Sequence, residues 1–411
     1  MSSPASSASP ANTRFVRTRG SGIPARIADI VRRRAGELPI CLRLWNGREL
    51  QLSNAAPVAT VTIPRRRTLL ALAHDVEVTF GDLFAEGHVE VHGDLVTGLE
   101  AIYRSWRSTV QPKGGLVPGL LGNTLRRARA NVHHHYDIGN EFYRLWLDEQ
   151  LLYTCAYFAE PHDTLEEAQR AKMDLVCRKV RLCPGERVVE AGCGWGALAL
   201  HMARHYGVSV RAFNISREQI LYARERASRE GLADRVEFIE DDYRSISGRY
   251  DAFVSVGMLE HVGRPHYAAL GEVIDRVLDP ETGRGLLHFI GRDWPRPLSR
   301  WIRARIFPGA YPPTLCEVFS DILEPHRLSI LDVENLRPHY AETLRHWLAR
   351  FDQAAARVEA MFDSWFVRAW RLYLAGSRAS FTTGTLQLFQ VTFTRTGSND
   401  VPWTREYLYS R

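Results

Sequence analysis

We expect an α/β protein whose larger part is a doubly wound, mainly parallel sheet with a helical insert, preceded by a small N-terminal α+β domain. Three observations predict this. From about residue 131, apolar strand-like runs alternate with amphipathic helical runs, as in sheets whose parallel strands are joined by helices. A glycine-rich turn directly follows the first of these strands. Before residue 107, most of the chain consists of short runs in which apolar and polar residues alternate, and this change predicts a separate unit.

The first part of the chain predicts a tail, a small domain and a linker. Residues 1–22 are rich in Ser, Ala and Pro and predict a disordered tail. Two Pro and four Gly in residues 108–122 predict a linker. We therefore expect a tail at 1–22, a small domain at 23–107, a linker at 108–130 and a large domain at 131–411. Within the small domain, a short helix is expected at 24–36, strands at 41–45, 59–63, 74–80 and 88–93, and a helix at 95–106.

The large domain is predicted from its periodicity. Runs rich in Val, Ile and Phe predict strands, and longer runs with apolar residues three or four apart predict helices. Helices are expected at 140–148, 165–180, 197–206, 217–231 and 267–278, and strands at 186–192, 208–214, 236–241, 251–257 and 285–290. Residues 296–375 are predicted to be a helical insert, and a strand at 385–395 is expected to close the sheet.

Composition excludes several classes of protein. The chain has 411 residues, 45% hydrophobic and 24% charged, which fits a globular protein of two domains. No run of 18 apolar residues occurs, so no transmembrane helix is expected. Six scattered cysteines without paired metal-ligand spacing favour reduced thiols over a disulfide framework.

The net charge of +6 is unevenly distributed. Residues 1–130 hold 18 Arg or Lys against 10 Asp or Glu, whereas residues 131–411 hold 35 against 37. The basic excess of the N-terminal part predicts an anionic partner, either a membrane surface or a nucleic acid. No recognised nucleic-acid motif accompanies the basic clusters, so we expect a membrane surface and no nucleic acid.

The glycine-rich turn predicts a ligand loop. It reads Gly192-Cys193-Gly194-Trp195-Gly196, two residues after Glu190. Glycine is required where a tight strand-to-helix turn brings the backbone close to a ligand. The spacing is neither that of the dinucleotide loop nor that of a phosphate loop. It resembles the S-adenosylmethionine loop of class I methyltransferases, whose sheet is Rossmann-like; the alternative is a purely structural turn.

The next two strands end in further candidate cofactor contacts. Asn214 stands where an acid usually holds the ribose hydroxyls, and Gln219 follows one helical turn later. Ser216 and Gln219 also have the spacing of a capping box, which would start a helix with or without a ligand. Asp242 and Tyr243 follow the third strand, where the adenine would lie, although Tyr243 would equally suit the core.

Five segments together resemble the cyclopropane-fatty-acid synthase family, which includes the mycolic acid cyclopropane synthases and related lipid C-methyltransferases. These segments are residues 135–140, 153–158, 192–196, 256–263 and 287–291. The resemblance covers about residues 131–395. Residues 40–105 also resemble the small N-terminal domain of the full-length bacterial synthases. The chain departs from the usual family pattern at Glu190-Ala191 and at Phe213-Asn214.

The resemblance implies a reaction on a lipid. The cis double bond of a phospholipid acyl chain attacks the methyl group of S-adenosylmethionine, and loss of a proton from the new methyl group closes a cyclopropane ring. In the family the base is a bound bicarbonate, whose ligands correspond here to Cys155, Glu260, His288, Ile290 and Tyr340. The cofactor contacts would include Tyr153, Thr154, Gly192, Gly194 and Gly196. Relatives of similar sequence add a methyl or methylene branch without closing a ring, so that alternative stays open.

The physical requirements of this reaction are consistent with the residues found, but single residues also have a structural explanation. An alkene is a poor nucleophile and water would trap the cation, so the site must be aromatic and poor in water. A buried Glu260 should have a raised pKa. Taken alone, Cys155 and His288 would equally suit an ordinary hydrophobic core.

The expected substrate, an unsaturated phospholipid in the bilayer, implies a cytoplasmic protein that associates peripherally with the inner face of the cell membrane. Candidate docking surfaces combine cations with aromatic or aliphatic residues; the alternative is a solvated basic face. They are Arg65 to Arg67, residues 126–129, and the segment that holds Trp294, Arg296, Arg300, Trp301, Arg303, Arg305, Ile306 and Phe307.

Other expectations concern assembly, metal and rival functions. The resemblance makes a homodimer plausible. The three consecutive histidines 133–135 would point in different directions, so no metal site is expected. Two rival functions stay open, a non-catalytic lipid-binding protein and a methyltransferase acting on a small molecule in water.

Overall fold

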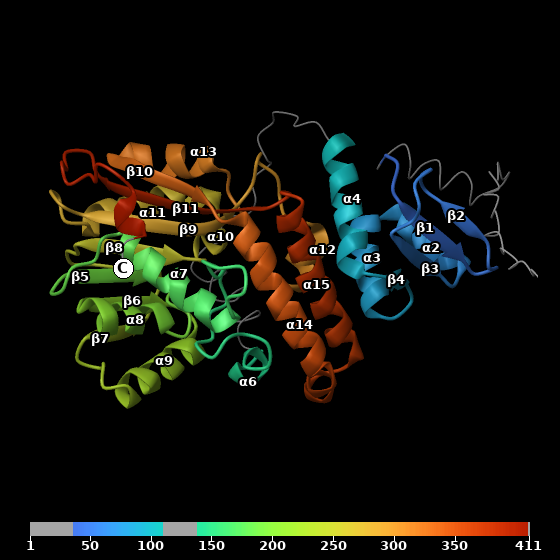
Figure 1. Cartoon of the computed structure of the whole chain (residues 1–411), viewed down its shortest axis with the longest axis horizontal. Helices are drawn as coiled ribbons and strands as arrows, with labels where there is room; N and C mark the ends of the chain where they lie inside the picture. The colour runs from blue at the N-terminus through green and yellow to red at the C-terminus, as the bar shows by residue number, and fades with distance from the viewer. Residues whose placement is uncertain (1–35, 110–137, 410–411) are drawn as a thin grey trace, which may run out of the picture.

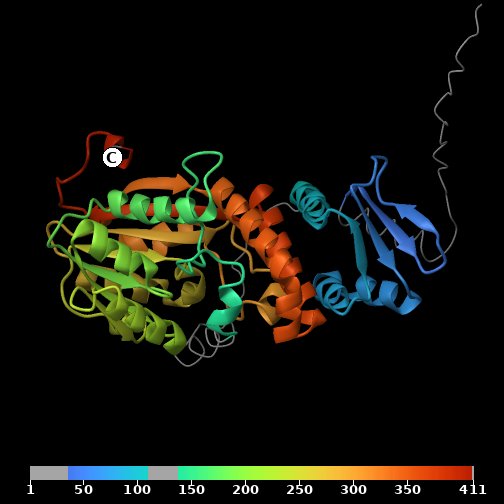
Figure 2. The ribbon, with the colours of Figure 1, turned by 60° about the horizontal axis from the view of Figure 1, so that its bottom comes forward.

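The computed structural model describes residues 36–109 and 138–409. Two sheets organise them (Figure 1). A four-stranded sheet has the order β2-β1-β3-β4, and a seven-stranded sheet has the order β10-β11-β9-β8-β5-β6-β7. The helices α14 (Arg337–Met361) and α15 (Ser364–Thr382) stand between the large sheet and the small unit (Figures 1 and 2). The predicted tail, most of the predicted linker and the three histidines lie outside the described residues.

The small unit combines its sheet with three helices. Its strands are β1 (Ile40–Leu44), β2 (Glu49–Gln51), β3 (Ala59–Ile63) and β4 (Glu90–Gly93), and its helices are α2 (Arg66–His74), α3 (Val76–Ala85) and α4 (Leu95–Thr109). The strand predicted at 74–80 is wrong, because these residues are helical. Asp75 caps α3 by accepting a hydrogen bond from the Val78 amide, and Phe80 stacks on Phe84 one helical turn later.

The large sheet is parallel through its centre, as predicted. Its parallel strands are β5 (Arg187–Ala191), β6 (Ser209–Asn214), β7 (Val236–Glu240), β8 (Ala252–Val256) and β9 (Arg284–Gly291). The helices that connect them are α8 (Ala197–Tyr206), α9 (Arg217–Arg229) and α11 (Tyr267–Val277), and α7 (Leu165–Lys179) precedes them. Successive residues on β5, Val188 and Val189, belong to hydrophobic clusters on opposite faces of the sheet. Hydrophobic side chains therefore pack against both faces of the sheet, which explains why the sequences of these strands are almost continuously apolar.

The predicted helical insert also contains a strand. Residues 296–375 include α12 (Arg300–Arg305) and α13 (Leu315–Val318), but β10 (Leu328–Asn335) lies between α13 and α14. This edge strand pairs antiparallel with β11 (Gln387–Arg395), and its register shifts between Ile330 and Asp332. The irregularity breaks the two-residue alternation by which a strand is recognised in a sequence. The helix predicted at 140–148 is also shorter, since α6 spans only Asn140–Tyr143.

Helix α12 joins the small unit to the large one and corrects one docking surface. Trp301 is buried against Gly81 of α3, and its indole nitrogen donates to Asp82 at 3.0 Å. Arg305 forms an ion pair with Asp82 at 2.9 Å, and Arg300 forms one with Asp75 at 2.8 Å. Trp301, predicted to face a membrane, is instead buried between the two units, whereas Arg300 and Arg305 bridge the units and remain exposed.

In the described ranges 36–109 and 138–409, none of the helices has both the length and the apolar character needed to cross a bilayer.

Candidate active site

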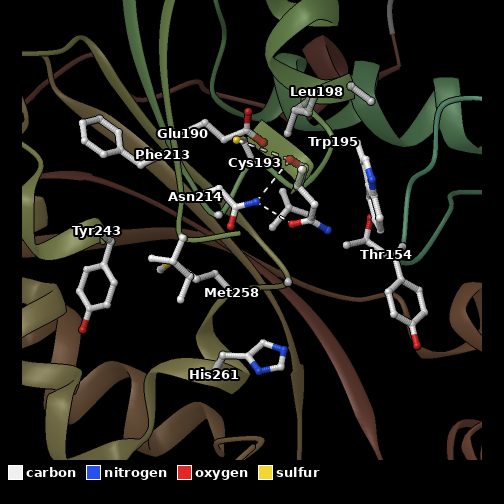
Figure 3. A pocket seen from close by; sticks show the side chains of 18 of the residues that line it. Thr154, Glu190, Cys193, Trp195, Leu198, Phe213, Asn214, Tyr243, Met258 and His261 are labelled. Atoms are coloured by element: carbon white, nitrogen blue, oxygen red, sulfur yellow. Dashed lines mark hydrogen bonds between the residues drawn. The ribbon is translucent and has the colours of Figure 1, made fainter. Parts of the chain in front are cut away.

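A pocket opens at the carboxyl ends of β5, β6 and β8, where the strand order of the parallel sheet reverses (Figure 3). Ligands of α/β proteins bind at this kind of position. The pocket holds about 1090 Å³ of empty space, its open mouth included, which suits a small-molecule site. Its walls include all but one of the nine predicted cofactor contacts, namely Tyr153, Thr154, Gly192, Gly194, Asn214, Gln219, Asp242 and Tyr243.

The glycines of the loop have different surroundings. At Gly194, φ is +53° and a Cβ atom would meet nothing within 4 Å, so the backbone faces open space in the pocket. At Gly196, φ is +83° and a Cβ atom would lie 2.5 Å from the Phe238 ring. Gly196 does not line the pocket. The structure thus places it behind the wall, where its lack of a side chain permits packing of α8 on β7.

Asn214 and Gln219 form a pair in the pocket wall. The Asn214 side-chain amide donates to Gln219 Oε1 at 2.6 Å and to the Gly194 carbonyl at 3.3 Å (Figure 3). Ser216 caps α9 by accepting from the Gln219 amide at 3.5 Å. The Gln219 side chain points to Asn214 instead of completing the reciprocal capping box. Both expectations for Gln219 therefore hold in part, since it starts a helix and also lines the pocket.

Asp242 and Tyr243 form another part of the wall. Asp242 is buried and accepts hydrogen bonds from the Arg244 amide at 3.0 Å and from its guanidinium at 3.3 Å. The Arg244 guanidinium also lies 4.9 Å from the centre of the Tyr243 ring. Burial raises the pKa of Tyr243 to about 12, so its hydroxyl stays protonated.

Two buried charged residues line the same pocket and were not predicted as site residues. Lys172 on α7 donates to Thr154 Oγ1 at 2.8 Å, and Glu190 is the second-to-last residue of β5. Burial lowers the pKa of Lys172 to about 8 and raises that of Glu190 to about 8. The signal available in the sequence was a lysine on the apolar face of a helix, at i+4 from Ala168 and i−4 from Val176.

Glu260 and Ile290 are in direct contact. Glu260 is 6% exposed on the short helix α10 (Leu259–Val262), and its Oε1 accepts from the Ile290 amide at 2.5 Å. Its Oε2 is buried without a hydrogen-bond partner among the described residues. Burial raises the pKa of Glu260 to about 7, as predicted.

His288 lies two residues before Ile290 on the same strand, so the two side chains share a face of β9. The Gln390 side-chain amide forms a hydrogen bond with His288 Nδ1 at 3.0 Å. Burial lowers the pKa of His288, so its ring is neutral.

Cys155 and Tyr340 are linked through Thr343. The Ala156 amide, next to Cys155, donates to Thr343 Oγ1 at 3.0 Å, and Thr343 lies one turn beyond Tyr340 on α14. Cys155 is fully buried, which raises the pKa of its thiol. The Tyr340 ring lies 4.5 Å from that of Phe381. None of the five predicted catalytic residues lines the cofactor pocket.

The sequence also missed His261, which lines the pocket beside Met258 (Figure 3). Burial lowers the pKa of His261 to about 4, so its ring is neutral. The ring lies 5.9 Å from Phe307, which follows the interface helix α12. His261 lies in the segment 256–263 that carries the family resemblance, next to Glu260, but that segment alone does not show that its ring lines the cofactor pocket.

Comparisons with known proteins agree with this geometry. Residues 123–391 match the family described as mycolic acid cyclopropane synthetase. The chain is 35% identical over 382 residues to a probable fatty acid methyltransferase of Pseudomonas putida, covering 90% of this chain and 96% of that one. It is 40% identical over 303 residues to the cyclopropane-fatty-acyl-phospholipid synthase of Escherichia coli K12, covering 73% and 77%.

Solved structures of cyclopropane synthases are also similar to this chain. The mycolic acid cyclopropane synthase CmaA1 complexed with SAH and CTAB superimposes with a TM-score of 0.61 at 30% identity, covering 65% of this chain and 98% of that one. The cyclopropane synthase MmaA2 from Mycobacterium tuberculosis gives a TM-score of 0.62 at 29% identity, with the same coverage. The cofactor is therefore S-adenosylmethionine, and the chain is a methyltransferase that belongs to the mycolic acid cyclopropane synthetase family.

Proposed function

We propose that this enzyme transfers a methylene group from S-adenosylmethionine to the cis double bond of an unsaturated phospholipid acyl chain and forms a cyclopropane ring. The main support is the buried cluster of Glu260, Ile290 and His288. Glu260 and Ile290 touch directly, and β9 carries both His288 and Ile290. Ring closure requires a proton to leave the new methyl group, and a buried carboxyl with a pKa near 7 suits the control of a proton.

The residues present fit a bound bicarbonate. Glu260 Oε2 is a buried acceptor without a partner among the described side chains, which suits the hydroxyl of bicarbonate. The His288 ring, held at Nδ1 by Gln390, suits a bond from its other nitrogen to one of the bicarbonate oxygens. Cys155 and Tyr340 complete the set that the family resemblance implies. Bicarbonate would supply a base that accepts the proton and cannot be alkylated into the protein.

The surroundings suit a cationic intermediate on the acyl chain. Cys155 and Tyr340 belong to a core rich in aromatic side chains, including Trp146, Trp195 and Trp347. Such a core excludes water, which would otherwise trap the cation, and ring faces stabilise positive charge.

A methyl- or methylene-branched product is the second candidate. The relative that covers 90% of this chain is named a probable fatty acid methyltransferase. The two reactions share the methyl transfer and differ in the fate of the cation. A cyclopropane forms when the new methyl group loses a proton and its carbon closes on the cationic carbon. A methylene branch forms when a hydride shifts to the cationic carbon before a methyl proton leaves, and a methyl branch that keeps a double bond forms when a chain carbon loses the proton, so the same residues would serve both.

The proposal includes peripheral contact with the anionic inner face of the membrane and a homodimer. Because Trp301 is buried and Arg300 and Arg305 are already paired with Asp75 and Asp82, the exposed cluster Arg65 to Arg67 is the described surface that we propose for anionic headgroups.

The product decides the function. The purified chain is incubated with S-adenosylmethionine and liposomes of cis-monounsaturated phospholipid, and the fatty acids are analysed by gas chromatography and mass spectrometry. We expect an acyl chain heavier by one CH₂ that resists hydrogenation. A product of the same mass that takes up hydrogen would establish a branched chain instead, and the absence of any lipid product would contradict both candidates.

Glu260→Gln tests the role of the carboxyl. The amide oxygen can still accept from Ile290, so the fold should persist while turnover falls by about 10²-fold or more, the usual scale of acid–base catalysis. Glu317→Gln is a control for the loss of a buried carboxyl, because Glu317 is also buried but its oxygens bond Tyr311 and Thr314 instead of Ile290. Equal turnover in both variants would refute the assignment of Glu260.

A further inference from the structure

Lys172 is a buried cation in the wall of the cofactor pocket. Its side chain is on the inner face of α7, it is 1% exposed, and it lines the pocket together with Thr154 and Glu190. Its ammonium donates to Thr154 Oγ1 at 2.8 Å. Among the residues of 36–109 and 138–409, no carboxylate lies within 4 Å of it.

A buried ammonium without an ion pair requires an explanation. Taking a charge out of water is costly unless an opposite charge or several hydrogen bonds replace the water. An ammonium has three N–H donors, and the structure gives Lys172 one acceptor. Two donors are thus left over at the edge of a pocket that binds a ligand.

The cofactor carries a group that fits these donors. The methionyl end of S-adenosylmethionine has one carboxylate and one ammonium, whereas its adenosyl end has no anionic group. We propose that the Lys172 ammonium binds the methionyl carboxylate of the cofactor and holds Thr154 in place beside it. This inference concerns the cofactor only and does not depend on which lipid product forms.

Lys179 provides a matched comparison on the same helix. It lies two turns beyond Lys172, is also buried, and forms an ion pair with Glu334 at 2.5 Å. It does not line the pocket. Lys179 is thus paired with an acid in direct contact, whereas Asp148 and Glu190 act on Lys172 only across more than 4 Å.

The test separates the carboxylate from the rest of the cofactor. Binding of S-adenosylhomocysteine, which has the amino-acid part, and of 5′-methylthioadenosine, which lacks it, is measured by titration calorimetry on the full chain. We expect Lys172→Met to weaken S-adenosylhomocysteine binding about tenfold or more, the scale of one charge-assisted hydrogen bond, and to leave 5′-methylthioadenosine within twofold. Lys179→Met should leave both affinities unchanged.

Each other outcome has a definite meaning. If Lys172→Met weakens both ligands equally, Lys172 has only a structural role and the proposal is overturned. Unchanged binding of both ligands overturns it as well. If the wild-type chain binds neither ligand, the cofactor assignment itself fails, which is distinguishable from failure of the Lys172 assignment.

Two further measurements exclude misfolding of Lys172→Met as the cause of lost binding. They use the variant Lys172→Gln and the pH dependence of the wild type. Glutamine can still donate to Thr154 but carries no charge, so the same selective loss is expected. In the wild type, the preference for S-adenosylhomocysteine should change as pH rises from 7 to 8.5, because Lys172 and Glu190 both titrate near pH 8, and the part of this change that comes from the lysine should be absent in Lys172→Gln. The charged or titratable groups that face Lys172 are Asp148, Cys155, Glu190 and His288, and the first three favour its protonated form. A pH dependence that is the same in Lys172→Gln as in the wild type contradicts the proposal.

Discussion

At the scale of single residues, spacing predicted the ligand loop but not the task of each glycine in it. Gly194 faces open space, whereas Gly196 lies against the Phe238 ring. Phe238 belongs to β7, which is distant in sequence, so no local pattern reveals that contact. The same reason explains why His261 was missed, since its burial depends on where other strands and helices lie. Lys172 does have a local signal, because its apolar neighbours at i±4 predict a buried side chain, but that signal does not reveal the pocket.

Alanine at the two loop glycines should separate ligand binding from folding. Gly194→Ala adds a Cβ in open space and strains a left-handed backbone by about 1–2 kcal/mol, so the fold should persist while cofactor affinity falls. Gly196→Ala adds a clash at 2.5 Å to similar strain and should destabilise the fold by about 3 kcal/mol or more. Denaturant unfolding and S-adenosylhomocysteine titration measure both. Equal stability of the two variants would contradict this division.

At the scale of elements, the periodic core was predictable and the irregular pieces were not. Strands β5, β6, β7, β8 and β9 have continuous apolar runs, because both faces of the sheet are covered, and their positions were predicted closely. Helix α3 was taken for a strand because Val76, Val78 and Phe80 alternate with polar residues. The capping contact of Asp75 and the packing on α12 decide in favour of the helix, and the second of these is a tertiary effect.

The contact between α3 and α12 can be tested with one methyl group. Alanine usually stabilises a helix by about 1 kcal/mol relative to glycine. At Gly81 the added Cβ would lie 2.4 Å from the Trp301 indole nitrogen, so we expect Gly81→Ala to destabilise the protein by about 1–3 kcal/mol, as overpacking does. Thermal and denaturant unfolding measure the change.

Gly376→Ala is the control for this variant. Gly376 lies on α15, in the same contact region, but its added Cβ would sit 3.4 Å from the Tyr103 hydroxyl, an ordinary distance. It should be neutral or slightly stabilising. If Gly81→Ala is stabilising as well, the close packing of Trp301 on α3 is not present in solution.

At the scale of the whole molecule, one hydrophobic core crosses from the small unit into the large one. It includes Phe84 and Leu99 of the small unit together with Trp301 and Trp370. The composition and the pattern of strand-like and helix-like runs predicted two units. They did not predict that α12 and α15 would hold the units together through a shared core. That arrangement depends on contacts between segments more than 200 residues apart, such as Trp301 with Asp82. Basic residues at the interface therefore resembled a lipid-facing surface in the sequence.

The remaining basic surface leads to a prediction for the molecule as a whole. Arg65 to Arg67 are exposed at the start of α2, in the part of the chain that carries the positive excess. An arginine close to an anionic bilayer contributes about 1 kcal/mol, so replacing all three with glutamine should weaken binding to anionic vesicles at least tenfold at low salt. Sedimentation with vesicles measures this. Replacing the exposed Arg217, Arg229 and Arg235 of the large unit with glutamine makes the same change in net charge and should have little effect. If both triple variants lose binding equally, the attraction reflects net charge alone and the cluster at 65–67 is no docking surface.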